Sequence, residues 1–328
     1  MISIIMPVYN AQNYLDKSIG SVIIQSCDKW ELIAMDDGST DNSLEILEGY
    51  AEKEPRIRVF HQENQGPGIA RNNAVKYATG DYVAFLDADD YIDINYIEIL
   101  QKEIFQTNAD VIFFNSVQEH QNGSVIQELN KSCFSNLTKE ELVKNQLSAK
   151  LEWGMPNKIV KKSVIVNNGL LCSEDPVGEE ALFSFELLRN AKVIKFVNKI
   201  LYHYVHNSTG QHSKGDYDPW KSVVLRLKKH LQDNSIYVQY QKLLNCLAIK
   251  ALSICLYRVA LTNKKKQKLK LMKEKCKWYK ENFSFNSKEI DKCALDKTSK
   301  LLLPLIKINA MFPIIILSKI RSFKLKRK

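Results

Sequence analysis

Short apolar runs alternate with helix-like segments over the amino-terminal part of the chain, and this alternation constrains the fold more than any other feature. The four runs occupy residues 2–6, 31–35, 57–61 and 82–86. Their near-continuous apolar character is typical of strands buried on both faces of a parallel sheet. The segments between them have apolar residues at a spacing near 3.6 and occupy residues 14–25, 43–51 and 69–77. Strands joined by helices predict a doubly wound α/β domain over residues 1–115.

The composition limits the class of protein. The chain has 328 residues, of which 45% are hydrophobic and 26% charged, which excludes a disordered or collagen-like chain and leaves room for a large core. Seven cysteines are scattered without a Cys-x-x-Cys pair. This pattern argues against a zinc ribbon or a disulfide framework and favours a reducing compartment. The amino-terminal segment has no basic stretch before its first apolar run, so we expect no signal peptide.

Charge is distributed unevenly along the chain, although the net charge is +10. Residues 1–100 contain 7 Lys and Arg against 17 Asp and Glu, whereas residues 221–328 contain 27 against 6. The acidic part is a poor match for a nucleic-acid enzyme and suits a site that holds a divalent cation. Because the basic part has no aromatic platform or nucleic-acid motif, we do not expect nucleic acid as a partner.

The chain beyond residue 115 has two parts. The pattern predicts a strand at 111–115, helices at 139–150 and 177–189, and short strands at 193–196 and 201–205. After Pro219 it predicts helices, with apolar residues at helical spacing in 223–231 and 237–261. We therefore expect a domain over residues 1–218, made of halves 1–115 and 116–218, and a basic helical region over 219–328.

Residues 301–328 combine an apolar segment with a basic end. Residues 301–317 are nearly all apolar, but Pro304, Lys307 and Pro313 argue against a membrane-spanning helix. An apolar segment followed by KIRSFKLKRK is typical of binding to an anionic membrane surface. The alternative is a helix packed on the rest of the protein, followed by a solvated basic end.

Polar residues follow each of the four predicted strands. They form the stretches Pro7-Val8-Tyr9-Asn10, Asp36 to Asp41, Glu63 to Gly68 with Ala70-Arg71-Asn72, and Asp87-Ala88-Asp89-Asp90. Functional groups of an open α/β sheet lie at the carboxyl ends of its strands. We therefore expect these side chains to converge on one crevice.

Asp87 and Asp89 form the sharpest element of this predicted site. Two carboxylates at positions i and i+2 after a strand can face one hard cation, and Mg²⁺ or Mn²⁺ is commonly held by one or two carboxylates with substrate phosphates. The alternative is an acidic turn in which Asp90 or Asp93 caps a helix over residues 94–106.

The other strand ends suggest a nucleotide site. Asp37 can accept a hydrogen bond from a nucleobase N–H, and Tyr9 can place its ring against that base. Gly66 and Arg71 can place backbone N–H groups and a cation near the nucleotide. The structural alternatives are an Asx-type turn with Gly38, packing of Tyr9, a tight turn and a solvated arginine.

Taken together, these segments resemble the family 2 glycosyltransferases, which have the GT-A fold. The resemblance rests on MISIIMPVYNAQNYLDKSIGSVIIQSCDKWELIAMDDGSTDNS and NQGPGIARNNAVKYATGDYVAFLDADDYI and thins out toward residue 215. It implies a mixed sheet flanked by helices and a DxD-type motif that binds a divalent metal, Mn²⁺ or Mg²⁺. By this resemblance Asp89 is the metal ligand and Asp87 lies near the ribose or the metal. It also implies a nucleotide-sugar site formed by Pro7, Val8, Tyr9, Asp37, Gly66, Arg71, Asp87 and Ala88.

The resemblance also implies where the catalytic base and the acceptor lie. The family has a Gly-Glu-Asp pattern before an aromatic residue, and this chain has Gly178-Glu179-Glu180 before Phe183. Glu180 is the expected base and Glu179 the alternative; the structural alternative is two acids at a helix amino-terminus. The segment from Trp153 to Lys158 resembles the acceptor-side segment. Relatives often carry Tyr-Arg before a serine-containing loop, whereas this chain has Tyr202 to Ser208 without the arginine, so His203 or His206 is a candidate for binding the diphosphate.

We therefore expect a metal-dependent, inverting transfer of a hexose or N-acetylhexosamine from a nucleotide sugar, best matched by a UDP-sugar, to a saccharide hydroxyl. The resemblance suggests a lipid-linked acceptor and a role in capsule, O-antigen or exopolysaccharide assembly. The expected location is the cytoplasm, at the inner face of the plasma membrane. The main alternative is a non-catalytic scaffold that binds sugar nucleotides. A nucleotidyltransferase is disfavoured because no Gly-rich, basic loop follows the first strand.

Overall fold

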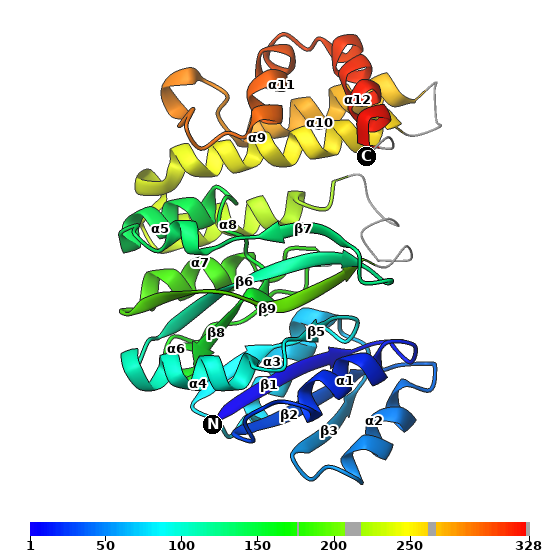
Figure 1. Cartoon of the computed structure of the whole chain (residues 1–328). Helices are drawn as coiled ribbons and strands as arrows, with labels where there is room; N and C mark the ends of the chain where they lie inside the picture. Colours follow the sequence, from blue (N-terminus) through cyan, green and yellow to red (C-terminus); the bar gives the residue numbers. More distant parts are fainter. Residues whose placement is uncertain (176, 207–217, 262–266, 326–328) are drawn as a thin grey trace. The chain divides into compact units, whose positions relative to one another are not determined.

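The computed structural model describes residues 1–175, 177–206, 218–261 and 267–325. The chain divides into two compact units (Figure 1). Unit 1 comprises residues 1–143 and 153–210, and unit 2 comprises residues 144–152 and 211–328. The second unit therefore includes a short segment that precedes the expected boundary near residue 218.

Unit 1 is built on one mixed sheet, to which the described residues contribute nine strands in the order β3-β2-β1-β4-β8-β6-β9-β5, with β7 paired to β6. Four neighbouring strands are parallel to one another: β1 (Ile2–Val8), β2 (Trp30–Asp37), β3 (Ile57–Gln62) and β4 (Tyr82–Phe85). The remaining strands are β5 (Tyr91–Ile92), β6 (Val111–His120), β7 (Val125–Leu129), β8 (Lys158–Lys161) and β9 (Ile194–His206). The predicted α/β domain with a mixed sheet is confirmed.

The register of the parallel strands places their carboxyl ends side by side. Val8 of β1 lies opposite Asp36 of β2, and Asp37 lies opposite Gln62 of β3. The loops that follow these strands therefore share one edge of the sheet, as expected for an α/β fold.

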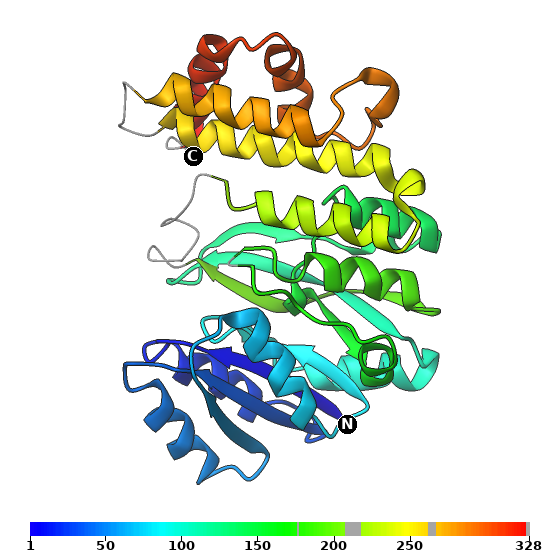
Figure 2. The same ribbon diagram turned by 180° about the vertical axis from the view of Figure 1, so that it is seen from behind.

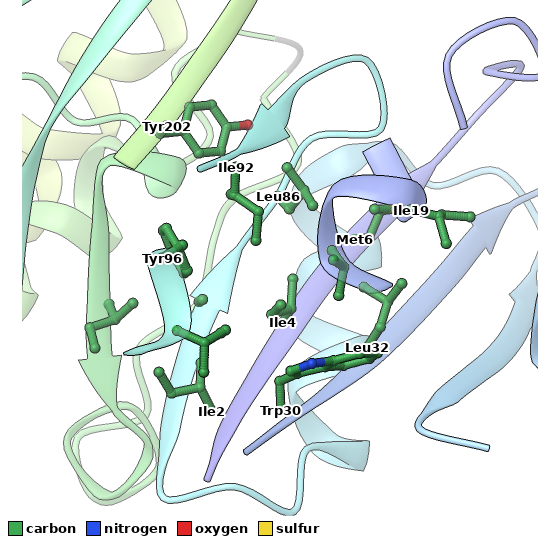
Figure 3. Packing of buried hydrophobic residues seen from close by; sticks show 14 of the residues in the cluster. Ile2, Ile4, Met6, Ile19, Trp30, Leu32, Leu86, Ile92, Tyr96 and Tyr202 are labelled. Carbon is green, nitrogen blue, oxygen red and sulfur yellow. The ribbon is translucent and has the colours of Figure 1, made fainter. Parts of the chain in front are cut away.

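Helices pack against both sides of these strands. They are α1 (Leu15–Ile23), α2 (Ser43–Ala51), α3 (Pro67–Tyr77) and α4 (Tyr96–Thr107). One side of β1, with Ile2, Ile4 and Met6, joins Ile19 of α1 and Tyr96 of α4 in a buried cluster (Figure 3). The other side of the sheet is buried as well, which explains why the strands lack a polar alternation.

Two sequence predictions about this unit are wrong in detail. The helix expected over residues 94–106 begins at Tyr96, with Asn95 as its cap residue and no side-chain cap. Asp93 accepts a hydrogen bond from the Asn95 N–H (2.8 Å) in the preceding turn. The strands expected at 193–196 and 201–205 form one strand, β9. Its pairing with β6 shifts register next to Asn115, and these shifts accommodate the polar residues between the two expected strands.

Besides strand β8, the described chain between β7 and β9 is mainly made of helices and loops. It contains α5 (Lys139–Leu147), α6 (Lys162–Asn167) and α7 (Ala181–Asn190). The segment between α6 and α7 bears Glu179 and Glu180, and α3 packs against it through contacts described below. The helix predicted from residue 177 therefore begins four residues later, just after the acidic pair.

Unit 2 is helical over its described residues. It contains α8 (Lys221–Asp233), α9 (Tyr237–Leu261), α10 (Lys268–Asn282), α11 (Lys297–Lys307) and α12 (Met311–Leu325). Helix α10 runs alongside α9 in both views (Figures 1 and 2). Among the described residues, α9 alone has the length and mean hydropathy (1.6) of a membrane span, and 78% of that window is buried. Helix α9 is the core helix of this unit.

Helices α11 and α12 have a buried and an exposed side. Leu302 and Ile306 of α11 and Ile314 of α12 are buried, and both helices pack on α9. The two helices and the turn between them also expose apolar residues, with exposed fractions from 49% to 75%: Leu301 of α11, Ile308 of the turn, and Phe312, Ile316 and Ile320 of α12.

Candidate active site

Arg71 lies at the centre of the candidate site in unit 1. It occupies α3, which begins after Gly66, and its side chain is buried. Its Nη1 donates to Oε1 of Glu179 at 2.6 Å, and its Nη2 donates to Oδ1 of Asp87 at 2.7 Å. Burial alone would lower the pKa of Arg71, but the charges of Asp87 and Glu179 raise it above its ordinary value. One permanently charged guanidinium thus joins the segment after β4 to the segment before α7.

Glu179 and Glu180 form a hydrogen-bonded pair directly before α7. Burial raises the pKa of Glu180, and the charge of Glu179 and the hydrogen bond with it add to this effect, so that the pKa is about 7. Burial acts on Glu179 in the same direction, but the charge of Arg71 and the hydrogen bonds from Glu180 and Arg71 outweigh it and lower the pKa of Glu179. The pair therefore consists of one ionised carboxylate and one carboxyl group that titrates near neutral pH.

Close backbone packing fixes the segment that carries this pair against α3. The Asn72 side chain accepts from the Cys172 N–H and donates to the Cys172 carbonyl oxygen, each at 2.9 Å. At Gly68, a Cβ atom would lie 2.3 Å from the Ser173 carbonyl oxygen. The Ser173 N–H donates to the Glu179 carbonyl oxygen at 2.8 Å. Small size at Gly68 therefore permits the approach that brings Glu179 to Arg71.

The four residues after β4 separate into a buried and a partly exposed set. Asp90 is buried; its Oδ2 accepts from the Tyr202 hydroxyl at 2.7 Å and its Oδ1 from the Val205 N–H at 2.8 Å. Burial, aided by the charges of Asp87 and Asp89, raises the pKa of Asp90 well above its ordinary value. Asp90 therefore anchors β9 and does not cap the following helix.

Asp87, Ala88 and Asp89 form a turn closed by a 3.0 Å hydrogen bond from the Asp90 N–H to the Asp87 carbonyl oxygen. Ala88 is buried, whereas the two carboxylates are partly exposed. Two such carboxylates are hard oxygen ligands, the type that Mg²⁺ and Mn²⁺ prefer. The described residues contain no cluster of three or more His, Cys, Asp or Glu side chains suited to a metal, so water and substrate phosphates would supply the remaining ligands of a cation held here.

The Asp37 carboxylate shapes the loop between β3 and α3. It accepts hydrogen bonds from the Gln62 side chain (2.7 Å), the Gln65 N–H (2.9 Å) and the Gly66 N–H (2.8 Å). Asp37 is 2% exposed, and these three contacts use both of its carboxylate oxygens. Gly66 has a φ of +87°, which favours glycine, and it precedes the first turn of α3.

The remaining predicted nucleotide residues follow β1 and β2. Pro7 and Val8 are buried, and Tyr9 is 43% exposed directly after β1. Asp36 is buried and contacts His61 Nδ1 at 2.7 Å, so it forms part of the turn rather than its surface. The structure thus leaves Tyr9 accessible at the carboxyl edge of the sheet.

Trp153 and Lys158, predicted on the acceptor side, are both buried. The Lys158 ammonium donates to the Trp153 carbonyl oxygen at 2.9 Å, and also to the Gly154 carbonyl and the Asn157 side chain. The Ser184 hydroxyl donates to the same Trp153 carbonyl at 2.6 Å. Lys158 therefore closes the turn before β8 and contacts no open surface.

The histidines after Tyr202 have different environments. The His203 ring stacks on Tyr91 with centroids 4.3 Å apart, and its Nδ1 lies 3.4 Å from Oε2 of the buried Glu119. His206 is exposed at the end of β9. Asn207 and Ser208 lie outside the described residues.

Sequence reasoning did not reveal two relationships in this site. The contact of Arg71 with Glu179 spans 108 residues, and that of Tyr202 with Asp90 spans 112. No local sequence pattern marks either pair, because a motif read from one sequence does not show which distant charged or aromatic residues meet in the fold.

Comparison with known proteins identifies this arrangement. Residues 3–161 match Glycosyl transferase family 2. The putative glycosyltransferase EpsH of Bacillus subtilis is 29% identical over 262 residues, which cover 78% of this chain and 76% of EpsH. A glycosyltransferase family 2 domain therefore occupies residues 3–161 of this chain. The matches cover smaller shares of other relatives, for example 30% of the glycosyltransferase GlyA of Streptococcus pneumoniae, which is 34% identical over 217 residues.

Solved structures show the same fold. The TarS fragment 1–349 of S. aureus, determined in complex with UDP-GlcNAc, has a TM-score of 0.66 at 19% identity and covers 99% of this chain and 92% of its own. The mannosyltransferase PcManGT from Pyrobaculum calidifontis, determined with GDP-Man and Mn²⁺, has a TM-score of 0.54 at 14% identity, with 98% and 86% covered. The predicted GT-A fold of this family 2 glycosyltransferase is confirmed.

Proposed function

We propose that this glycosyltransferase moves a hexose or an N-acetylhexosamine, with inversion, from a nucleotide-diphosphate sugar to a hydroxyl of a saccharide acceptor. The proposal rests on one observation: Arg71 holds a carboxylate of the DxD-type segment, Asp87, and a carboxylate of the acidic pair, Glu179. One guanidinium group therefore contacts both the DxD-type segment, which would bind the donor, and the acidic pair, which would contain the base.

In the proposed reaction, ionised Glu180 accepts the proton of the acceptor hydroxyl. The acceptor oxygen forms a bond to the anomeric carbon while the bond from that carbon to the phosphate oxygen breaks, and the nucleoside diphosphate leaves with the electron pair. A single displacement inverts the anomeric configuration. A base works best when its pKa lies near the working pH, and the pKa of Glu180, about 7, meets this condition.

UDP-sugars are the proposed donors. Tyr9 offers an exposed aromatic ring, and Asp37, although only 2% exposed, lies at the same edge of the sheet as the expected acceptor for a base N–H. The structure of TarS with UDP-GlcNAc adds support for a uridine carrier. Pro7 and Val8 would form the floor beneath this nucleotide.

A divalent cation fits the partly exposed carboxylates of Asp89 and Asp87, and the Mn²⁺ complex of PcManGT favours the same view. Bound there, Mn²⁺ or Mg²⁺ would act as a Lewis acid that stabilises negative charge on the leaving diphosphate. Arg71 contributes a fixed positive charge beside Asp87, which limits repulsion between this carboxylate and the donor phosphates.

A thermal-shift panel of nucleoside diphosphates, with and without Mn²⁺, tests the donor site. A ligand at 100 times its Kd stabilises the folded state by about 2.7 kcal/mol, so a matching nucleotide stands out. We expect UDP with Mn²⁺ to give the largest shift, and Asp89→Ala to abolish it. Asp81→Ala is the matched control, because Asp81 is 84% exposed and precedes β4 at the other end of the strand. No response to any nucleotide would contradict the proposed donor site.

Sugar transfer separates an enzyme from a non-catalytic scaffold. Glu180→Gln is expected to lower kcat about 10²–10⁴-fold, as for loss of a general base, while the UDP thermal shift persists. Nucleotide binding without transfer to any saccharide, by the wild-type protein, would favour the scaffold.

We further propose that the acceptor is lipid-linked and that unit 2 binds the inner face of the plasma membrane. Helices α11 and α12 expose an apolar side formed by Leu301, Ile308, Phe312, Ile316 and Ile320. The region from residue 221 contains 27 Lys and Arg against 6 Asp and Glu. An apolar surface on a basic unit matches an anionic lipid surface, and this location would suit the assembly of a cell-surface polysaccharide.

A further inference from the structure

We propose that Arg71 is a positioning residue that assigns different roles to the two members of the acidic pair: it holds Glu179 as a fixed anion and leaves Glu180 to act as the base. This inference rests on the proposed function and deepens it. The two acids are adjacent in sequence and in space, so their neighbours must decide which of them takes the proton.

Glu179 is committed to contacts within the protein. Its side chain is 11% exposed, its Oε1 accepts from Arg71 at 2.6 Å, and it is hydrogen-bonded to Glu180. Its main chain is also fixed, because its carbonyl oxygen accepts from the Ser173 N–H. A carboxylate held in this way is poorly placed to move toward a substrate hydroxyl.

Glu180 has the opposite character. It is the cap residue of α7 and is partly exposed, and the two Nη groups of Arg71 donate to Glu179 and Asp87 rather than to it. The ionisable groups that face it are Glu179 on its own segment, Arg71 from α3 and the buried Cys172 thiol. Arg71 keeps the nearest of these, Glu179, negative. Glu180 therefore carries the proton that the pair exchanges near neutral pH.

The guanidinium of Arg71 makes this division possible through two separate contacts. Nη1 reaches Glu179 and Nη2 reaches Asp87, whereas the buried Nε has no hydrogen-bond partner among the described residues. An unpartnered buried N–H is unfavourable, and the two charge-assisted contacts compensate for it. A lysine can supply the charge, but its single nitrogen cannot occupy the separate positions of Nη1 and Nη2, so at least one of the two carboxylates would have to shift.

Four variants test this assignment: Arg71→Met, Arg71→Lys, Glu179→Gln and, as a control, Arg58→Met. Arg58, near the amino-terminal end of β3, contacts Glu31 of the neighbouring strand β2 at 3.2 Å, so this ion pair lies at the end of the strands opposite to the site. The readouts are the kcat and KM for transfer from a UDP-sugar, the pH dependence of kcat/KM, and the UDP thermal shift.

The acidic limb of the kcat/KM profile should shift in opposite directions in Arg71→Met and in Glu179→Gln. Arg71→Met removes the cation that lowers the proton affinity of the pair, so the acidic limb should rise by at least one pH unit. Glu179→Gln removes the anion that raises the pKa of Glu180, so the acidic limb should fall while transfer persists. Arg71→Lys retains the charge and should keep the limb within about half a unit, with kcat lowered about 10²-fold because a displacement near 1 Å is costly.

The inference can fail while the proposed function stands. If Arg71→Met folds, binds UDP and shows the wild-type acidic limb, like Arg58→Met, then Arg71 has a structural role only. If Glu179→Gln abolishes transfer and Glu180→Gln does not, the roles are reversed. If Arg71→Met does not fold, Arg71→Lys and Glu179→Gln still decide the question. Absence of transfer by the wild-type protein would instead overturn the proposed function itself.

Discussion

The Tyr202 hydroxyl donates a 2.7 Å hydrogen bond to the buried Asp90 carboxylate and accepts one, at 3.2 Å, from the Asp87 N–H. Tyr202 belongs to β9, and Asp87 and Asp90 follow β4, so one phenol ties two segments that are distant in sequence. This contact sets the position of the turn that carries Asp87 and Asp89.

Tyr202→Phe should therefore lower both stability and donor binding. Loss of the hydroxyl leaves Asp90 and the Asp87 N–H without one partner each, which costs about 1–3 kcal/mol in free energy of unfolding. We expect the KM for the donor to rise because the Asp87 turn is less well fixed. Urea unfolding and steady-state kinetics measure the two effects. Tyr50→Phe is the control, since Tyr50 bonds Asp16 at an exposed position and its loss should change stability by less than about 0.5 kcal/mol.

The Glu180 carboxyl group should make stability depend on pH. Its pKa in the folded protein, about 7, lies above the ordinary value of 4.5, so folding favours the neutral form. The stability that it contributes is complete below pH 4.5 and is lost as pH rises through 7. Relative to Glu180→Gln, the wild-type unfolding free energy should fall by up to about 3 kcal/mol between pH 5 and pH 8. Parallel curves for the two proteins, in urea titrations across this range, would contradict the raised pKa.

Gly68→Ala should destabilise the site specifically. The new methyl group would lie 2.3 Å from the Ser173 carbonyl oxygen, which is backbone and can yield only if the segment before Glu179 moves. Overpacking of this kind costs about 1–3 kcal/mol, and we expect kcat to fall with it. Gly49→Ala on α2 is the matched control: its Cβ meets nothing within 4 Å, and alanine favours a helix by about 1 kcal/mol over glycine. Thermal unfolding should thus show opposite shifts for the two variants.

Phe312 and Ile316 on α12 should carry much of the proposed membrane affinity. The double variant Phe312→Glu/Ile316→Glu places two anions on a side that is now apolar and exposed. We expect sedimentation with vesicles containing anionic lipid to drop at least about tenfold, because apolar burial is lost and charge repulsion is gained. Phe105→Glu provides the control, since Phe105 is 91% exposed on α4 of unit 1. Equal binding by all three proteins would overturn the membrane proposal.

The sequence predicted those features that depend on local pattern. Buried parallel strands are apolar on both faces, so the runs before Asp37 and Asp87 were recognisable, and polar side chains at the carboxyl ends of such strands indicate a site. The acidic pair at Glu179 and Glu180 was recognised through family resemblance, because two acids before a helix are common without any catalytic role.

Features that depend on distant contacts could not be predicted. Arg71 was expected beside a nucleotide, but its two carboxylate partners, Asp87 and Glu179, follow only from the three-dimensional packing of α3. Lys158 was expected near the acceptor, yet its ammonium is buried among carbonyl oxygens, because a long apolar stem can place a charge in the interior when acceptors surround it.

The apolar pattern of residues 301–317 is compatible both with membrane binding and with packing on the protein. Membrane binding and packing on the protein were treated as alternatives, but a helix has two sides. Leu302 and Ile306 are buried while Leu301 and Ile308 are exposed. A segment that is apolar all around can therefore pack on α9 and still present an apolar surface.

The close approach of Gly68 to Ser173, together with the bonds between Asn72 and the Cys172 backbone, has a consequence for how such enzymes can be recombined. The amino-terminal 115 residues look like a segment that could be exchanged as a unit, but Cys172, Ser173 and Glu179 form the surface that α3 packs against. A chimera that takes its first half from a relative would join two surfaces that do not match, unless the segment before α7 comes from the same parent.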